Sequence, residues 1–300
     1  PALLHPADVV PSWLPAAASG AERVVLLVID GLGWAQLASR RRLTPTLDRL
    51  DGGPITTVAP STTATALTSI STGLPPGEHG VVGYRMAVHG EVLNVLRWST
   101  AAGDARQTIP PSKIQTQPAF GGQRPPVITR AEFERSGFTL AHLDETRFTG
   151  YRTLGTLAAE VVRLARAGEP FVYAYYEGLD KVSHEYGLGA PYDEELRWVD
   201  HLVSRLLEEL PAGTVLVVTA DHGQVEVPQE QVLELPSDVL THVATQSGEG
   251  RFRWLHARSG RTAALLDAAQ GALSDHAWVR SRDEAIAEGW YGPVVTETAS

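Results

Sequence analysis

The chain has 300 residues, of which 43% are hydrophobic, and a formal charge of −10 from 35 acidic and 25 basic residues. This length and apolar content suffice for one large α/β domain or two smaller ones, and the acidic balance argues against nucleic acid as the main partner. The absence of cysteine excludes disulfides, thiolate catalysis and cysteine-bound zinc, so any metal would bind Asp, Glu, His or hydroxyl oxygens.

Three short apolar runs, at residues 24–29, 171–176 and 214–219, predict buried strands. Helical patterns over residues 154–168 and 192–213 precede the second and third runs. This alternation predicts an α/β fold with a mainly parallel central sheet and helices on both faces.

Two segments fit this framework poorly. Residues 85–150 hold a stretch rich in Pro, Gly, Gln and Ser, which predicts an inserted cap segment. Residues 251–300 combine a strand-like run with a helical pattern, which predicts a small αβ appendage. The core is accordingly assigned to residues 1–84 and 151–250.

No apolar run approaches the ~20 residues that span a bilayer, so no membrane partner is expected. The first residues, PALLHPADVV, lack the charged-then-apolar pattern of a signal peptide. We therefore expect a cytoplasmic protein, although a chain that starts at proline leaves room for a leader already removed. The sequence does not indicate an oligomeric state.

The segment VIDGLG, residues 28–33, allows two interpretations: a glycine turn that binds a dinucleotide, or a metal-binding carboxylate at a strand end. The dinucleotide fingerprint requires a third glycine at position 36, where the sequence has Gln36. Asp30 would also place a negative charge where the pyrophosphate approaches. The sequence favours Asp30 as a metal ligand.

Acidic and imidazole side chains follow each predicted strand. They are Asp30 after the first, Asp180 and His184 after the second, and Asp221 and His222 after the third. Because ligands bind at the carboxyl ends of parallel strands, these side chains should gather at one edge of the sheet. Each alone is more typical of a cap or a loop hydrogen bond, but the set favours one or two divalent cations, zinc or manganese.

The segment between the first two strands, residues 59–84, is rich in Ser and Thr. A helix that begins near Thr63 would direct free N–H groups and a positive dipole end at an anion. The plainer alternative is an ordinary helix with a Ser or Thr cap.

Taken together, these segments resemble the alkaline phosphatase superfamily, and within it the nucleotide pyrophosphatase/phosphodiesterase branch. The resemblance rests on Asp30, STGLPPGEHGVVGY, DKVSHEYG and TADHG, in that order over residues 22–225. It implies a metal-dependent hydrolase of phosphodiester or pyrophosphate bonds in a small phosphorylated or nucleotide-like substrate. It also implies two divalent cations, zinc in the first instance and manganese as the alternative.

The resemblance assigns the nucleophile to Thr63, with Thr62 as the fallback, and implies a phosphothreonine intermediate. It implies one set of ligands for each metal ion: Asp30, Thr63, Asp221 and His222 for the first, and Asp180, His184 and one further His for the second.

Two positions depart from the family pattern. The Asn that usually binds a phosphate oxygen is replaced by Tyr84, whose phenol can still donate a hydrogen bond, so we expect Tyr84 to bind substrate. The further His usually lies in a His-Gly pair, and none follows His222. His242 is the best remaining candidate, ahead of His256 and His276. This departure predicts that the sequence ends before the fold is complete.

Other functions would use nearly the same residues. A phosphomonoesterase, a phosphonate hydrolase or a phosphomutase of the same superfamily shares almost all of them. A degenerate metal- or nucleotide-binding module without catalysis is the alternative from another class. A nicotinamide-dependent dehydrogenase has no support beyond the first glycine turn.

Overall fold

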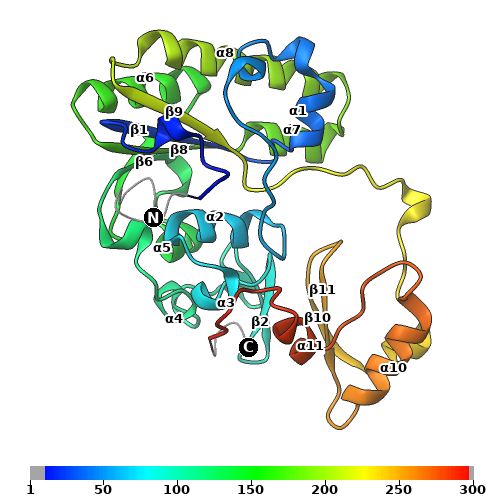
Figure 1. Ribbon diagram of the computed structural model, residues 1–300. Coiled ribbons are helices and arrows are strands. Elements are labelled where there is room, and N and C mark those ends of the chain that lie inside the picture. The colour runs from blue at the N-terminus through cyan, green and yellow to red at the C-terminus, as the bar shows by residue number, and fades with distance from the viewer. Residues whose placement is uncertain (1–10, 297–300) are drawn as a thin grey trace. The chain divides into compact units, whose positions relative to one another are not determined.

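The computed structural model describes residues 11–296, and the chain divides into two compact units (Figure 1). Unit 1 comprises the residues up to Thr57, Ile70–Gly73 and Gln117–Glu226. Unit 2 comprises Val58–Ser69, Leu74–Thr116 and the residues from Val227 onward. Each unit is described by itself below.

A five-stranded parallel sheet forms the centre of unit 1, in the order β7-β6-β8-β1-β9 (Figure 1). Its strands are β1 (Arg23–Ile29), β6 (Pro126–Arg130), β7 (Arg147–Tyr151), β8 (Phe171–Tyr176) and β9 (Thr214–Thr219). The three strands predicted from apolar runs are β1, β8 and β9, which lie side by side. The predicted α/β fold with a mainly parallel central sheet is therefore confirmed.

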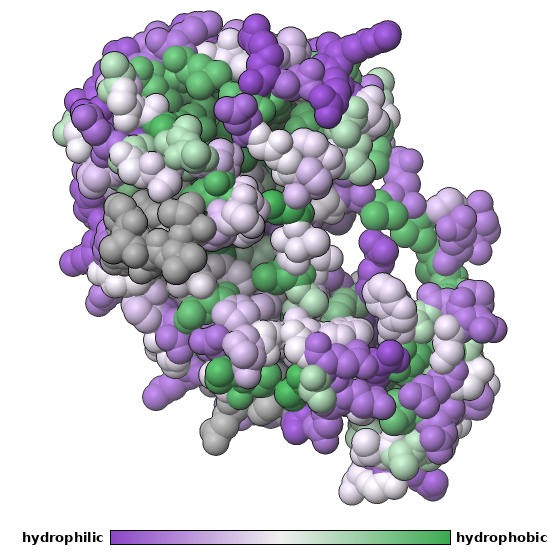
Figure 2. Space-filling view, in the orientation of Figure 1, coloured by the Kyte–Doolittle hydropathy of each residue, from purple (hydrophilic) through white to green (hydrophobic). Residues whose placement is uncertain are grey.

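The core of unit 1 lies between this sheet and the long helices α6 (Leu154–Arg166) and α8 (Ala190–Glu209). Both helices are amphipathic, as their sequence patterns predict. Hydrophilic residues line the outer edge of this unit in the space-filling view (Figure 2). The buried face of the core includes Val25, Leu27, Ile29, Val172, Ala174, Leu157, Val161, Leu196, Val199 and Leu206.

Strand alternation sends successive side chains of β8 to opposite faces of the sheet. Tyr176 joins the core with α6 and α8, and its hydroxyl donates to Glu195 of α8. Tyr173 packs on the other face against Phe120, with ring centroids 5.5 Å apart. Tyr175 points to that second face and reaches Asp30. This alternation decides which tyrosine meets the candidate site.

The segment predicted as a cap, residues 85–150, contributes to both units. Its last part supplies β6 and β7 to the central sheet of unit 1. Its first part forms a small antiparallel sheet in unit 2. Composition suggested an excursion here because β6 and β7 are only five residues long and β6 follows a stretch rich in Pro and Gly.

Unit 2 also contains an antiparallel hairpin and a small core formed by Val239, Val243, Leu265 and Ala269. Its strands are β2 (Arg85–Val88), β3 (Glu91–Asn94), β4 (Ser99–Thr100), β5 (Gly103–Asp104), β10 (Val243–Gly248) and β11 (Arg253–Ala257). Its helices are α3 (Pro76–His79), α4 (Pro111–Ile114), α9 (Ser237–Leu240), α10 (Thr262–Leu273) and α11 (Arg282–Ala287). Helix α2 (Thr63–Thr72) starts in this unit.

The remaining helices of unit 1 are short: α1 (Trp34–Ser39), α5 (Gly137–His142) and α7 (Gly178–Tyr186). Across residues 11–296, no helix has both the length and the apolar character needed to cross a membrane.

One buried carboxylate fixes the loop after α1. Asp200 of α8 accepts hydrogen bonds from the backbone N–H groups of Thr46 (2.9 Å) and Leu47 (2.8 Å). Asp200→Ala leaves both donors without this acceptor, so we expect it to lower the free energy of unfolding by about 3 kcal/mol. Asp200→Asn keeps one acceptor oxygen and should lose less. Urea unfolding measures both, and equal losses would contradict a role for the hydrogen bonds.

Candidate metal centre

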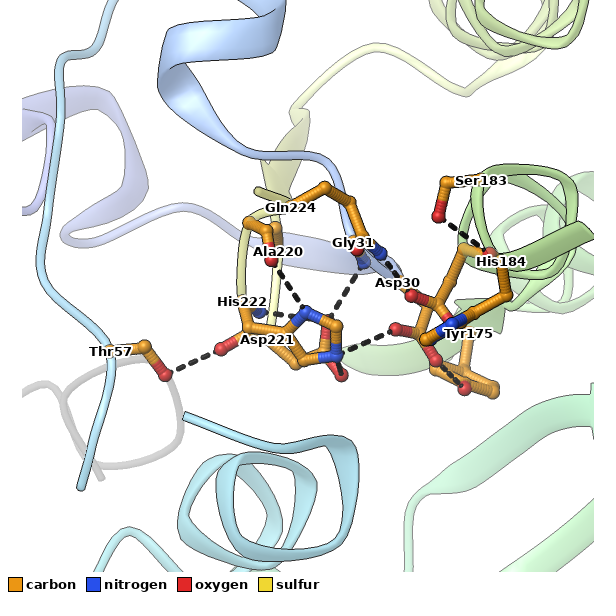
Figure 3. A network of polar contacts seen from close by, with 12 residues as sticks. Asp30, Gly31, Thr57, Tyr175, Ser183, His184, Ala220, Asp221, His222 and Gln224 are labelled. Atoms are coloured by element: carbon orange, nitrogen blue, oxygen red, sulfur yellow. Dashed lines mark hydrogen bonds and ion pairs between the residues drawn. The ribbon is translucent and has the colours of Figure 1, made fainter. Parts of the chain in front are cut away.

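Three predicted ligands meet at the carboxyl edge of the sheet in unit 1 (Figure 3). Asp30 follows β1 directly, and Asp221 and His222 lie in the loop after the neighbouring strand β9. One ligand atom from each residue lies within 4.8 Å of the other two. His222 Nε2 lies 3.3 Å from Asp30 Oδ1 and 3.6 Å from Asp221 Oδ2. Parallel pairing of β1 with β9 thus brings together residues far apart in the sequence.

Each of these carboxylates uses one oxygen for hydrogen bonds and presents the other to the histidine. The Tyr175 hydroxyl donates to Asp30 Oδ2. Asp221 Oδ1 accepts from the backbone N–H groups of Gly31 (3.1 Å) and His222 (2.9 Å). Asp30 Oδ1 and Asp221 Oδ2 are buried, and no group in the described part of the chain donates a hydrogen bond to either. Two buried oxygens without donors point to a cation.

The imidazole of His222 is oriented by its own loop. Its Nδ1 lies 3.0 Å from the carbonyl oxygen of Gly223. A proton on Nδ1 donates to that carbonyl, and the lone pair on Nε2 then faces Asp30 and Asp221. This is the tautomer that a metal ligand requires.

The electrostatics of the group also fit a cation. Burial raises the pKa of Asp30 well above its usual range, and the nearby carboxylates of Asp221 and Asp180 raise this pKa further. Burial likewise raises the pKa of Asp221, against the opposing effects of His222 and the Gly31 N–H. A divalent cation at this position would offset both the burial and the repulsion. One imidazole and two carboxylate donors fit such an ion.

Asp180 and His184 form a second, smaller group on α7. They lie one helical turn apart, with His184 Nε2 3.5 Å from Asp180 Oδ2, so the four-residue spacing does place them on one face. Asp180 is half-buried and the side chain of His184 is 73% exposed. Within residues 11–296, no third carboxylate or imidazole completes this pair as a metal-binding group.

The other predicted residues belong to unit 2. Thr63 is the first residue of α2 and is half-buried, whereas Thr62 before it is buried. Tyr84 directly precedes β2, and its hydroxyl accepts a hydrogen bond from Asn94 Nδ2 at 2.7 Å. His242 directly precedes β10. Asp30, Asp180, His184, Asp221 and His222 are described within unit 1, whereas Thr63, Tyr84 and His242 are described within unit 2. The roles of Thr63, Tyr84 and His242 therefore stay predictions.

The other two late histidines also lie in unit 2. His256 lies in β11, where its Nε2 is 2.8 Å from Ser247 Oγ. His276 is exposed after α10. The hydrogen bond of His256 within the hairpin is typical of a structural histidine.

Sequence reasoning did not identify Tyr175 or Gln224 as site residues. The only sequence signal for Tyr175 was a hydroxyl group in a strand predicted to be buried. Its contact with Asp30 depends on the register between β1 and β8, which the local sequence does not indicate. Gln224 follows the Asp-His-Gly segment and donates through Nε2 to Asp180 Oδ1. An amide in a loop carries no comparable signal.

Glycine is required at both positions of VIDGLG, for a different structural reason at each. Gly31 has a φ of +71°, and a Cβ there would lie 2.7 Å from Gln224 Nε2 and 3.0 Å from Asp180 Oδ1. A Cβ at Gly33 would lie 2.8 Å from the Cα of Gly223, so the turns after β1 and β9 pack backbone to backbone. The glycines therefore allow the ligand-bearing loops to approach each other.

Gly31→Ala should lower the free energy of unfolding by about 2–4 kcal/mol, since it adds steric conflict with two site residues to the strain of a positive φ. Gly20→Ala is the matched control, because Gly20 has a φ of +83° and its Cβ would meet no described atom within 4 Å. We expect this control to lose only about 1 kcal/mol. Chemical denaturation compares the two, and equal losses would show that the contacts around Gly31 are unimportant.

Asp30→Asn should stabilise the metal-free protein and weaken the stabilisation that added metal gives. In chelator we expect a higher melting temperature for the variant than for the parent, because one of two buried charges is gone and the new amide can donate toward Asp221. Added Zn²⁺ or Mn²⁺ should stabilise the parent by about 2.7 kcal/mol at a hundredfold excess over Kd, and the variant much less. Calorimetry with and without chelator measures this, and a variant less stable than the chelated parent would contradict it.

One protein family matches most of this chain. A family model described as type I phosphodiesterase/nucleotide pyrophosphatase matches residues 24–292. No curated protein sequence matches the chain.

Solved structures of a murine ectonucleotide pyrophosphatase/phosphodiesterase share the fold of this chain. Murine ectonucleotide pyrophosphatase/phosphodiesterase 5 aligns with a TM-score of 0.63 at 18% identity, covering 83% of this chain and 70% of that one. An inactive threonine-to-alanine variant of the murine protein in complex with AMP aligns with a TM-score of 0.63 at 17% identity, covering 84% and 70%. Phosphonoacetate hydrolase from Sinorhizobium meliloti 1021 aligns with a TM-score of 0.48 at 23% identity, covering 68% and 57%. The family model matches most of this chain, which therefore belongs to the type I phosphodiesterase/nucleotide pyrophosphatase family.

Proposed function

We propose that this protein is a metal-dependent hydrolase that cleaves phosphodiester or pyrophosphate bonds in nucleotide-like substrates. The observation that carries the proposal is the convergence of Asp30, Asp221 and His222 after β1 and β9, where one ligand atom from each residue lies within 4.8 Å of the other two and two carboxylate oxygens are buried without a donor. Family membership supports the reaction class. The AMP complex of the murine protein supports a nucleotide-like substrate.

Two divalent cations, zinc in the first instance, belong to this proposal. Asp30, Asp221 and His222 would hold one of them together with Thr63, and Asp180 and His184 would take part in holding the other. When bound, such cations neutralise phosphate oxygens and lower the pKa of a hydroxyl nucleophile. Tyr175 and the backbone N–H of Gly31 would keep the carboxylates of the first set oriented.

Thr63 is the proposed nucleophile. Its Oγ forms a bond to phosphorus as the bond between phosphorus and the leaving oxygen breaks, which gives a phosphothreonine and the leaving alcohol or phosphate. Water then cleaves the bond between Oγ and phosphorus, restores the Thr63 hydroxyl and releases the second product. The N–H groups at the start of the ten-residue helix α2 and the phenol of Tyr84 are suited to bind the phosphoryl oxygens.

Thr63→Ala should reduce turnover by about 10³-fold or more while phosphate still binds, because the attacking oxygen is removed while Asp30, Asp221 and His222 remain to hold the first cation. Thr62→Ala, one residue earlier, is the matched control and should retain turnover. Suitable substrates are bis-p-nitrophenyl phosphate, thymidine 5′-p-nitrophenyl phosphate and the monoester p-nitrophenyl phosphate, each with and without chelator. Faster turnover of the two diesters supports the proposal. Absence of chelator-sensitive turnover with all three would contradict it and favour a noncatalytic binding module.

A further inference from the structure

The two oxygens of Asp180 have different surroundings. Oδ1 accepts a hydrogen bond from Gln224 Nε2, whereas Oδ2 lies 3.5 Å from His184 Nε2. The carboxylate cannot rotate freely without losing the contact with Gln224. The oxygen next to the histidine is therefore the one presented for binding.

Gln224 is itself held in place by its neighbours. Its backbone carbonyl accepts a hydrogen bond of 2.9 Å from Gln36 Nε2 of α1. Its side-chain amide lies against the turn after β1, where a Cβ on Gly31 would come within 2.7 Å of Nε2. The residue is half-buried and lies two positions after His222. The amide that contacts Asp180 is thus fixed by the same loops that carry the Asp30, Asp221 and His222 group.

The Gln224 amide is uncharged, which also suits a position beside the Asp180 carboxylate. Three carboxylates interact here, since Asp221 and Asp180 both act on the buried Asp30. A Lys or Arg in place of Gln224 would put a positive charge against Asp180 Oδ1 and repel a cation. A glutamine donates a hydrogen bond to the carboxylate and leaves its negative charge available.

We propose that Gln224 is a positioning residue for a cation at Asp180 and His184: its amide occupies Oδ1 of Asp180 and directs Oδ2 to the side of His184. This inference rests on the proposed function for the presence of a second cation. It follows the arrangement of the first group, where Tyr175 occupies one oxygen of Asp30 and backbone N–H groups occupy one oxygen of Asp221.

Gln224→Met tests the proposal, since methionine has a similar length and lacks the donor. Metal-free protein is titrated with Zn²⁺ by isothermal calorimetry, and Asp30→Asn and Asp180→Asn assign the two binding events. We expect Gln224→Met to weaken the event that Asp180→Asn removes by about 10–100-fold and to leave the other unchanged. In the Asp180→Asn background, Gln224→Met should have no further effect. Gln229→Met, the same change at an exposed position, is the matched control.

Several results would overturn the proposal. These are unchanged affinity in Gln224→Met, equal weakening of both events, a further loss in the Asp180→Asn background, or a parent chain with no event that depends on Asp180. The titration contains no substrate, so its result remains valid even if the turnover assays contradict the hydrolase proposal. Conversely, unchanged zinc affinity would overturn the role of Gln224 even in a protein that hydrolyses phosphodiesters.

Discussion

Two buried carboxylates, Asp30 and Asp221, face a single imidazole at the carboxyl edge of the central sheet, and each presents to it an oxygen without a donor in the described structure. Burial of two like charges destabilises the metal-free protein unless a cation offsets them. The surrounding donors leave one oxygen of each carboxylate available.

The parallel sheet supplies the rigidity that this arrangement requires. β1 lies between β8 and β9, so Asp30, the Tyr175 hydroxyl and the Asp221 loop meet on a framework of backbone hydrogen bonds. Glycines at positions 31 and 33 let the loops approach closely enough for backbone groups to serve as donors. A loop that carried bulkier residues there could not bring the same atoms together.

The residues proposed for chemistry are carried by both units. Unit 1 provides carboxylates and imidazoles on strand ends and on α7, and unit 2 provides the start of α2 and the phenol of Tyr84. The contact between Asn94 and Tyr84 shows how this chain orients a phenol where the family resemblance leads one to expect an amide.

The sequence by itself determined the strands β1, β8 and β9, the amphipathic helices α6 and α8, and the residue types at the strand ends, because apolar periodicity and strand-end position are local properties. It did not determine that β6 and β7 belong to the sheet, since strands of five residues give little periodic signal and β6 also follows a Pro- and Gly-rich stretch. Only the tertiary structure decided that Tyr175 meets Asp30 and that Gln224 meets Asp180. Those contacts depend on sheet register and loop packing. Tyr175 lies 145 positions from Asp30, and Gln224 lies 44 positions from Asp180, so neither contact leaves a local pattern in the sequence.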